Sequence, residues 1–306
     1  MGLINKKRNK LHMNNFLWTS EYVSMGHPDK IADQISDALL DAYLDGDKNS
    51  RVAIETLVKD TTVVVAGEVT SNTEVDVDAV VRATIDTIGY NKPEMIFYGD
   101  GVEIIKRISK QSNEIHDAVD NDNNTGAGDQ GIMFGYATPD TPNFMPLSIY
   151  LASEFIRSAT ECRLQDRNSP LYPDMKSQVT VEYANDMTPV KVDTVVFSGC
   201  HPEHITLGKL RDYVRTVVKY KFLARLPDNI KKLFTADTKF LINTAGTWNI
   251  GGPIADAGLT GRKIVVDQYG ADCPIGGGAF SGKDYTKIDR SGAYAARHIA
   301  KYYANL

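Results

Sequence analysis

Three consecutive segments near the N-terminus, PDKIADQISDALLDAYL at Pro28–Leu44, RVAIETLV at Arg51–Val58 and TVVVAGEVT at Thr62–Thr70, carry the clearest structural signal of the chain. In the first, apolar residues recur at helical spacing behind a proline that a first helical turn tolerates, which predicts a helix. The other two are rich in β-branched residues and are joined by a short polar link, which predicts a hairpin. A second helix is expected at Val75–Ile88, where Gly89 would end it. The local unit is therefore a helix, a hairpin and a helix.

Later elements follow without a regular alternation of strands and helices. Helices are predicted at Leu147–Leu164 and Leu207–Leu223, and strands at Ser177–Tyr183 and Thr194–Ser198. Because a parallel sheet needs regularly spaced strand–helix–strand units, we expect mixed or antiparallel sheets covered by helices, an α+β fold.

Two polar stretches are expected to be mobile. Residues 1–12 are polar and basic and are interpreted as a mobile tail. Residues 111–131 are rich in Asn, Asp and Gly and are too long for a simple connection. Loops of that length in compact domains are usually lids or binding loops.

The composition excludes several classes of protein. The chain has 306 residues, with 34 basic and 39 acidic side chains and a formal net charge of −5. A mildly acidic chain lacks the positive field of a nucleic-acid binder. Three distant cysteines, Cys162, Cys200 and Cys273, form neither a disulfide framework nor a zinc motif. No apolar run has the length of a membrane helix. We therefore expect a cytoplasmic protein that binds neither nucleic acid nor membrane.

Two glycine-rich motifs come close to known nucleotide-binding patterns. Gly126–Gly131 fits G-x-G-x-x-G, but it follows polar residues and precedes an expected strand at Ile132–Tyr136, so we reject a dinucleotide-binding fingerprint. Gly277–Asp284 fits G-x-x-x-x-G-K, but Asp284 stands where a P-loop needs Ser or Thr. Its glycines and Lys283 could still hold phosphate oxygens. A glycine-rich turn with a solvated lysine is an equally good interpretation.

A third glycine-rich stretch is Gly251–Lys263, which precedes an expected strand at Ile264–Asp267. It places the adjacent cations Arg262 and Lys263 beside glycine turns. Such a pair suits an extended polyanion, although on its own it is more often part of a solvated turn.

The first predicted helix carries aspartates at every fourth position, which places them on one face. They are Asp29, Asp33, Asp37, Asp41 and Asp45. Like charges at this spacing repel one another, so most of the stripe is interpreted as a solvated outer face. Asp29 is the exception, because it lies in the first turn beside His27, where the helix dipole favours anions and a divalent ion could be held.

Two glutamates lie inside the predicted hairpin. Glu55 shares a strand face with Ala53 and Leu57, and Glu68 lies within an apolar run. A buried carboxylate without a cation or a hydrogen-bond donor is costly, so each is expected to be buried with a partner, which could be a ligand.

Taken together, four long motifs resemble those of S-adenosylmethionine synthetases (methionine adenosyltransferases). They are Gly26–Asp37, Gly126–Tyr136, Gly258–Lys263 and Gly276–Asp284. The resemblance runs from about Phe16 to Leu306. It implies an α+β fold of three similar sheet-plus-helix parts and active sites at a homodimer interface, with pairing of dimers into tetramers left open.

The family's reaction transfers the adenosyl group of ATP to the sulfur of L-methionine and hydrolyses the tripolyphosphate that is expelled. The resemblance implies Mg²⁺, two per site, and K⁺, one per subunit. His27, Lys176, Arg262 and Lys283 match residues of the reacting centre, His27 by stabilising the leaving oxygen and the cations by balancing the phosphate charge. Asp29 and Asp289 match magnesium ligands, and Glu55 matches the potassium ligand.

The resemblance also assigns residues to the two substrates. The matches to ATP-contact positions are Glu21, His27, Asp174, Lys176, Thr247, Trp248, Asp256, Arg262, Lys263, Ala279 and Lys283. The matches to methionine-contact positions are Glu68, Gln111, Asp129, Asp256 and Lys287. Residues 111–125 match the family's mobile lid, which is shortened here.

The chain also departs from the family pattern. Trp248 replaces a smaller aromatic residue, Ile275 a histidine, Tyr172 an arginine and Met25 an acidic residue. Leu306 follows soon after a helix expected around 294–303, whereas family members continue, so we expect the third part to be incomplete. The alternative to an active enzyme is a non-catalytic, truncated relative that binds ATP or a full-length subunit. An unrelated P-loop kinase or ATPase is the least favoured interpretation.

Overall fold

The computed structural model describes residues 15–110, 120–121, 124–125 and 129–306. The expected tail at 1–12, residue Gln111 and most of the expected lid lie outside these ranges. Of the lid, residues β5 (Asp120–Asn121) and β6 (Asn124–Thr125) pair as two short antiparallel strands.

The larger sheets of the described residues each contain four strands. The first has the order β1 (Phe16–Val23), β7 (Met175–Tyr183), β8 (Pro189–Gly199) and β9 (Lys239–Ile242), and only its β8–β9 pair is parallel. The second has the order β10 (Gly258–Leu259), β2 (Arg51–Lys59), β3 (Thr62–Thr70) and β4 (Glu103–Ser109), and only its β3–β4 pair is parallel. The sheets are therefore mixed, and the predicted α+β class is confirmed.

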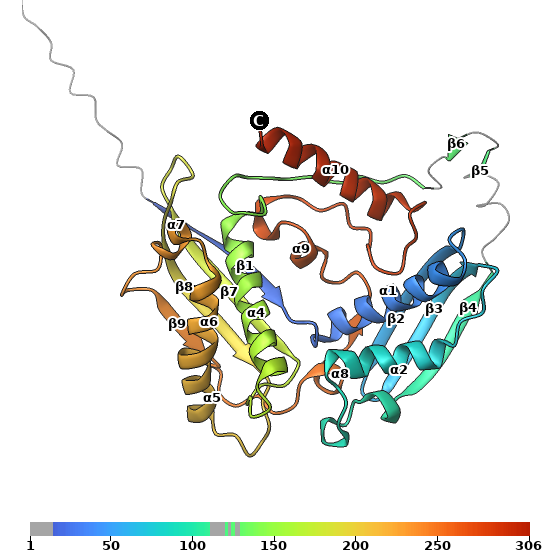
Figure 1. The fold of residues 1–306 in the computed structure, drawn as a ribbon, viewed down its shortest axis with the longest axis horizontal. Helices are drawn as coiled ribbons and strands as arrows, with labels where there is room; N and C mark the ends of the chain where they lie inside the picture. Colours follow the sequence, from blue (N-terminus) through green and yellow to red (C-terminus); the bar gives the residue numbers. More distant parts are fainter. Residues whose placement is uncertain (1–14, 111–119, 122–123, 126–128) are drawn as a thin grey trace, which may run out of the picture.

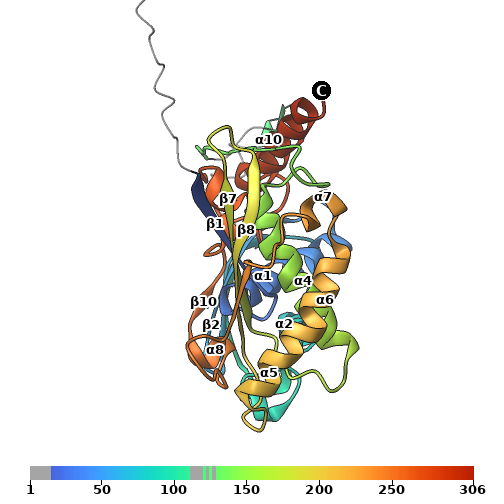
Figure 2. The same ribbon diagram turned by 90° about the vertical axis from the view of Figure 1, so that its left-hand side faces the viewer.

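Helices cover one face of each sheet (Figures 1 and 2). The second sheet is covered by α1 (Pro28–Gly46) and α2 (Val77–Ile88), whose buried residues form one core with alternate residues of β2 and β3. The first sheet is covered by α4 (Leu147–Gln165), α5 (Leu207–Tyr213) and α6 (Lys219–Arg225), which share a separate core with β7 and β8. Among the described residues, no helix covers the opposite face of either sheet (Figures 1 and 2).

Local chemistry explains where the first helices begin and end. Pro28 is the first residue of α1, and the His27 side chain accepts a hydrogen bond from Asp29 N, so it caps a free helical N–H. Asp76 caps α2 in the same way, and Gly89 ends α2 with a φ of 112°, which favours glycine. The predicted helix–hairpin–helix unit is confirmed.

The remaining elements lie between and after those already described. They are α7 (Asp228–Lys231), α8 (Gly252–Ala255), α9 (Ile264–Asp267), α10 (Ile288–Ala304), a π-helical stretch at 214–218 and 3₁₀ turns at 93–95, 99–101 and 270–272. Described residues from 250 onward therefore contribute β10 to the second sheet, together with three helices. Within the described ranges, no helix is both long and apolar enough to cross a membrane.

Two predicted strands are wrong. Residues 264–267 form the single helical turn α9, because the N–H groups of Asp267 and Gln268 bond back to the carbonyls of Lys263 and Ile264. Residues 132–136 are irregular and run beside α10 (Figure 1), where Arg297 donates to Tyr136 O. The carbonyl of Tyr136 is thus bonded by a helix side chain rather than by a neighbouring strand.

Candidate active site

The entrance of α1 carries the most deeply buried charged and titratable groups of the predicted site. His27 and Asp29 are only 3% and 2% exposed. Asp29 Oδ1 accepts from Leu259 N at 3.0 Å, and Asp29 Oδ2 accepts from Lys263 Nζ at 2.5 Å. Burial alone would raise the pKa of Asp29, but these hydrogen bonds outweigh it and hold the pKa below its usual range. The first turn of α1 is thereby fixed to the loop at 258–263.

His27 is held in its neutral form. Burial, followed by the charges of Lys263 and Lys176, lowers its pKa to about 4. Its Nδ1 accepts the N–H of Asp29 at 3.1 Å, which leaves the proton on Nε2. The 3.9 Å approach between His27 Nδ1 and Asp29 Oδ2 is therefore not an ion pair at neutral pH. The site offers one uncharged N–H donor among several cations.

Three predicted cations surround this imidazole. Lys263 and Lys176 both act on its pKa, and the Arg262 guanidinium lies 3.8 Å from Asp29 Oδ1. Lys176 and Arg262 are exposed, so both can reach a ligand in front of the helix. Asp256, also exposed, is near enough to oppose the cations in setting the pKa of His27. The structure thus brings together the predicted phosphate-binding cations of the α1 side.

Asp174 is a buried carboxylate with a free oxygen. It is 3% exposed, and its Oδ2 accepts from Gly252 N at 2.8 Å, whereas its buried Oδ1 has no hydrogen-bond partner. Burial raises its pKa to about 6. A buried polar atom without a partner indicates a missing ligand group or water.

The aspartate stripe of α1 is not the solvated face predicted for it. Asp33 is buried and accepts from Gly261 N at 2.9 Å. Asp37 accepts from Gly282 N at 2.9 Å and pairs with Arg290 at 2.7 Å. Asp41 and Asp45 are exposed as expected. The stripe is tolerated because loops from the distant C-terminal region supply donors to it, and these contacts place both glycine-rich loops along α1.

A second group of predicted residues lies on the open face of the second sheet. Glu55, Glu68 and Lys283 line one hollow. Lys283 reaches it because residues 282–284 pair with β2 through an Ala53–Lys283 bridge. The prediction that both glutamates are buried is wrong: both side chains are exposed, because no helix of the described ranges covers this face of the sheet.

The C-terminal loop holds its own carboxylates against lysines. Lys283 Nζ lies 2.6 Å from Asp289 Oδ2, and Lys287 pairs with the buried Asp284. Gly278 passes so close to Asp289 that an added Cβ would lie 2.2 Å from its carboxyl group. Asp284, the residue that rules out a P-loop, is buried. Its carboxylate accepts hydrogen bonds from Thr286 N and Val52 N and pairs with Lys287, and these contacts fix the loop.

The predicted metal ligands do not meet within one chain. In the part of the chain that the structure describes, no three His, Cys, Asp or Glu side chains gather closely enough to hold a metal ion. Asp29 and Asp289 each face a lysine instead. Carboxylate oxygens are nevertheless the donors that Mg²⁺ prefers, so the chemistry of both residues fits the ion.

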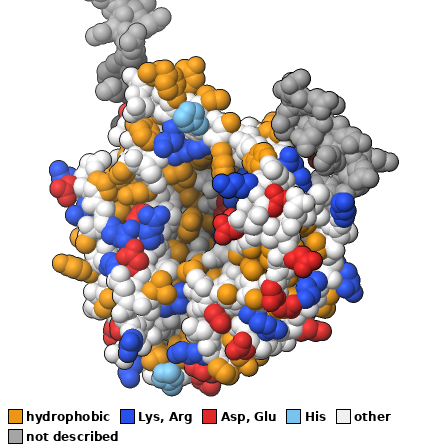
Figure 3. All heavy atoms as spheres, turned by 45° about the vertical axis from the view of Figure 1, so that its right-hand side comes forward, with side chains coloured by type: hydrophobic (Ala, Val, Ile, Leu, Met, Phe, Trp, Pro, Cys, Tyr) orange, Lys and Arg blue, Asp and Glu red, His pale blue; other side chains and the backbone are white. Residues whose placement is uncertain are grey.

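The other predicted residues are placed as follows. Glu21 and Asp129 are exposed, and Asp129 accepts from Gln130 N. Ala279 packs against Gly261, where an added Cβ would lie 2.5 Å away. Thr247 is exposed and Trp248 half-buried, in a turn whose Trp248 Nε1 donates to Ile250 O. On the face seen in Figure 3, acidic and basic side chains are interspersed rather than gathered into patches of one sign.

This α+β fold places glycine-rich loops, buried carboxylates and exposed cations around a neutral imidazole, features that suit an enzyme site for phosphate groups. Sequence models of the N-terminal, central and C-terminal domains of S-adenosylmethionine synthetase match residues 15–113, 124–248 and 250–305. The S-adenosylmethionine synthase of Azobacteroides pseudotrichonymphae genomovar. CFP2 is 47% identical over 295 residues, which cover 94% of this chain and 70% of that protein. That of Christiangramia forsetii is 47% identical over 294 residues, with the same coverages. The chain belongs to the S-adenosylmethionine synthetase family.

Proposed function

We propose that this chain transfers the adenosyl group of ATP to the sulfur of L-methionine and then hydrolyses the tripolyphosphate that leaves. The observation that carries the proposal is the neutral, buried His27 with its proton on Nε2. Attack of sulfur at C5′ breaks the C5′–O bond and builds negative charge on the departing oxygen. An N–H donor fixed by a helix entrance stabilises such an oxyanion without having to reorganise.

The cations around His27 balance the polyphosphate. Lys176, Arg262 and Lys263 would hold the chain of phosphates from the α1 side, and Lys283 from the glycine-rich loop. Asp29 and Asp289 would hold the two magnesium ions, which supply counter-charge to phosphate oxygens when bound. Glu55 would hold potassium. The lysines that now pair with both aspartates would then be free to contact phosphate.

The substrates are assigned by the same resemblance. Asp174, whose free oxygen has no partner, Glu21, Thr247, Trp248, Asp256 and Ala279 would contact the nucleoside part of ATP. Glu68, Asp129, Asp256 and Lys287 would contact methionine, together with Gln111, which lies outside the described residues. Residues 111–125 would act as the lid.

One complete site would need two subunits. The His27 group and the hollow of Glu55, Glu68 and Lys283 are separate in one chain, which supports a homodimer that joins them. The open face of the second sheet also carries Leu57 and Leu259, which are 37% and 36% exposed. Lys283 reaches the two glutamates within the same chain, since all three line one hollow, so the glycine-rich loop at this hollow does not have to come from the partner. Unpaired cysteines fit a cytoplasmic location.

A product assay tests the proposal. Incubation with ATP, L-methionine, Mg²⁺ and K⁺ should give S-adenosylmethionine, detected by mass spectrometry, with release of phosphate and pyrophosphate. Omission of methionine is the control that separates this reaction from simple ATP hydrolysis. Folded protein that forms no S-adenosylmethionine would refute the proposal and favour the non-catalytic alternative.

A further inference from the structure

His201 is completely buried, yet no step of the proposed reaction uses it. It lies two residues beyond the end of β8, beside the turn that carries Thr247 and Trp248. The backbone N–H of His201 donates to Trp248 O at 2.9 Å. Its ring nitrogen Nε2 lies 3.4 Å from Trp248 N, which donates to it. The main chain and the side chain of His201 therefore both form hydrogen bonds with the backbone of Trp248.

The ring is oriented by a second contact. Trp248 N can only donate, so Nε2 must be the acceptor and the proton of the neutral ring lies on Nδ1. Nδ1 lies 3.1 Å from Pro202 O and 3.2 Å from Asn249 Nδ2, and in this tautomer its N–H donates to the Pro202 carbonyl. The side chain of Asn249 also donates to His201 O at 2.9 Å. These bonds fix residues 248 and 249 against the strand end.

The same strand end holds the start of the turn. Asn243 Nδ2 donates to Gly199 O and Asn243 Oδ1 accepts from Gly199 N, each at 2.9 Å. Asn243 has a φ of 45°, an uncommon conformation that the two bonds stabilise. The turn between 243 and 249 is thus bound at both ends to residues 199–201.

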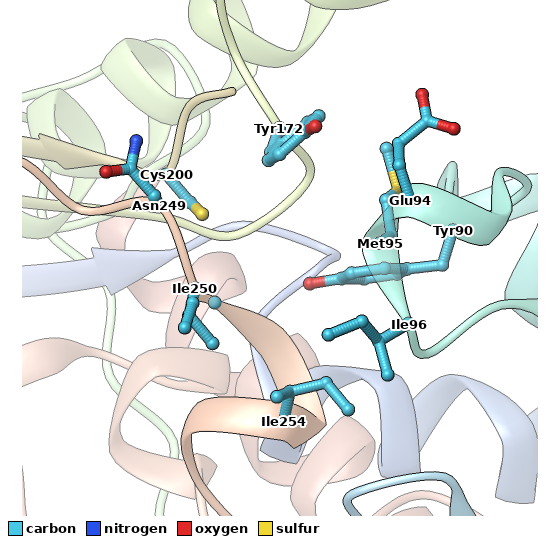
Figure 4. Close-up of a pocket in the computed structure, with 10 residues that line it drawn as sticks. Tyr90, Glu94, Met95, Ile96, Tyr172, Cys200, Asn249, Ile250 and Ile254 are labelled. Carbon is cyan, nitrogen blue, oxygen red and sulfur yellow. The ribbon is translucent and has the colours of Figure 1, made fainter. Parts of the chain in front are cut away.

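A cavity borders the end of the turn. Its volume is about 70 Å³, and it is lined by Asn249 and Ile250 and by Tyr90, Ile96, Tyr172 and Cys200 (Figure 4). Because this end of the turn borders open space, the hydrogen bonds to residues 199–201 are the contacts that fix its backbone.

We infer that His201 is a positioning residue, which sets Thr247 and Trp248 in the geometry that receives the adenine of ATP. The inference rests on the proposed function, in which these two residues contact the nucleoside. It predicts that the defect of a His201 variant depends on whether the substrate carries adenine.

Two substitutions separate the two ring nitrogens. In His201→Gln the amide oxygen can take the place of Nε2 and accept from Trp248 N, whereas the shorter side chain of His201→Asn can only replace Nδ1. The Asn variant should raise the KM for ATP by about tenfold, the equivalent of one lost hydrogen bond, and the Gln variant should restore most of it. Hydrolysis of added tripolyphosphate, which has no adenine, should keep its KM and kcat in both variants.

A spectroscopic readout makes the test independent of catalysis. The chain has two tryptophans, so Trp18→Phe leaves Trp248 as the sole reporter. In that background, His201→Asn should lower the fluorescence anisotropy of Trp248 and His201→Gln should not. If neither the unaltered chain nor any variant makes S-adenosylmethionine, the proposed function fails. The anisotropy of Trp248 then decides by itself whether His201 fixes the turn. Unchanged KM for ATP and unchanged anisotropy in His201→Asn would overturn the inference, as would an equal loss of tripolyphosphate hydrolysis.

Discussion

Lys263 Nζ lies 2.5 Å from Asp29 Oδ2 and ties the start of α1 to a loop 234 residues further along the chain. The same aspartate donates its backbone N–H to His27 Nδ1. One residue therefore fixes both the loop that carries the cations and the tautomer of the imidazole. Charge pairs and hydrogen bonds therefore fix the arrangement of these side chains. Each of them can be tested by substitution.

His27→Ala should slow adenosyl transfer by about 100-fold or more, because one donor to the leaving oxygen is lost. Hydrolysis of supplied tripolyphosphate should fall far less, since that step builds no charge at C5′. Rates of both reactions, measured on the same preparation, give the comparison. An equal loss of the two activities would show that His27 serves binding or folding instead.

His27 should also make stability depend on pH. Its pKa is about 4 in the folded chain and near 6.5 when unfolded, so the unfolded chain binds more protons between these values. Stability from the neutral imidazole is fully present above about pH 6.5 and is lost as pH falls toward 4, by about 3 kcal/mol. Asp174, whose pKa is raised to about 6, acts in the opposite direction over part of this range.

The contribution of Asp174 cancels when the free energies of unfolding of wild type and a His27 variant are subtracted. His27→Gln cannot titrate, so the stability difference between wild type and variant, from urea unfolding at pH 4.5 and 7, should shrink at the lower pH. A difference that stays constant would mean that the pKa of His27 is the same in the folded and the unfolded chain.

Met25→Glu should stabilise the chain. The guanidinium of Arg163 lies 3.8 Å from Met25 Sδ, donates to Ile88 O and has a buried Nε without a hydrogen-bond partner. Burial lowers the pKa of Arg163, which marks an under-compensated charge. A carboxylate at position 25 would supply a charged acceptor, a gain of about 1–3 kcal/mol. Thermal unfolding should show a higher Tm for Met25→Glu than for the uncharged control Met25→Gln; equal values would disprove the pairing.

Glu55→Gln should weaken the response of the enzyme to potassium and leave its magnesium requirement in place. Glu55 is exposed beside Lys283, so it is free to take up a cation from solvent. Rates measured against potassium at saturating magnesium separate the two ions. If the potassium curve is unchanged, Glu55 has another role, most directly as a partner of Lys283.

The sequence predicts local structure well and long-range charge pairing poorly. Periodicity and caps predict α1, β2, β3 and α2, because their signals lie within each segment. The strands β4, β9 and β10 were not predicted, and each pairs with a strand more than 40 residues away in the sequence. The β-branched residues at 264–266 favour a strand, but local backbone hydrogen bonds make them a helical turn.

The site residues follow the same rule. The motifs predict His27, Asp29, Arg262, Lys263 and Lys283, and the structure gathers the first four at one helix entrance. The roles of Asp33 and Asp37 were missed because their donors, Gly261 and Gly282, lie more than 220 residues away. The fourfold spacing of the aspartates, set against the two glycine-rich loops, was the signal that could have revealed them. His201 gave no signal, since its contacts are mostly with backbone atoms.

We propose that a complete site joins the His27 group of one subunit to the Lys283 group of another, and subunit exchange tests this most directly. Chains carrying His27→Ala and chains carrying Lys283→Ala, each inactive alone, should regain activity after they are mixed and exchange subunits. Random pairing makes half of the dimers mixed, each with one unaltered site of two, so S-adenosylmethionine formation should return to about one quarter of the wild-type rate. If His27 and Lys283 of the same chain served one site, every site in the mixture would lack one of them, and no activity would return.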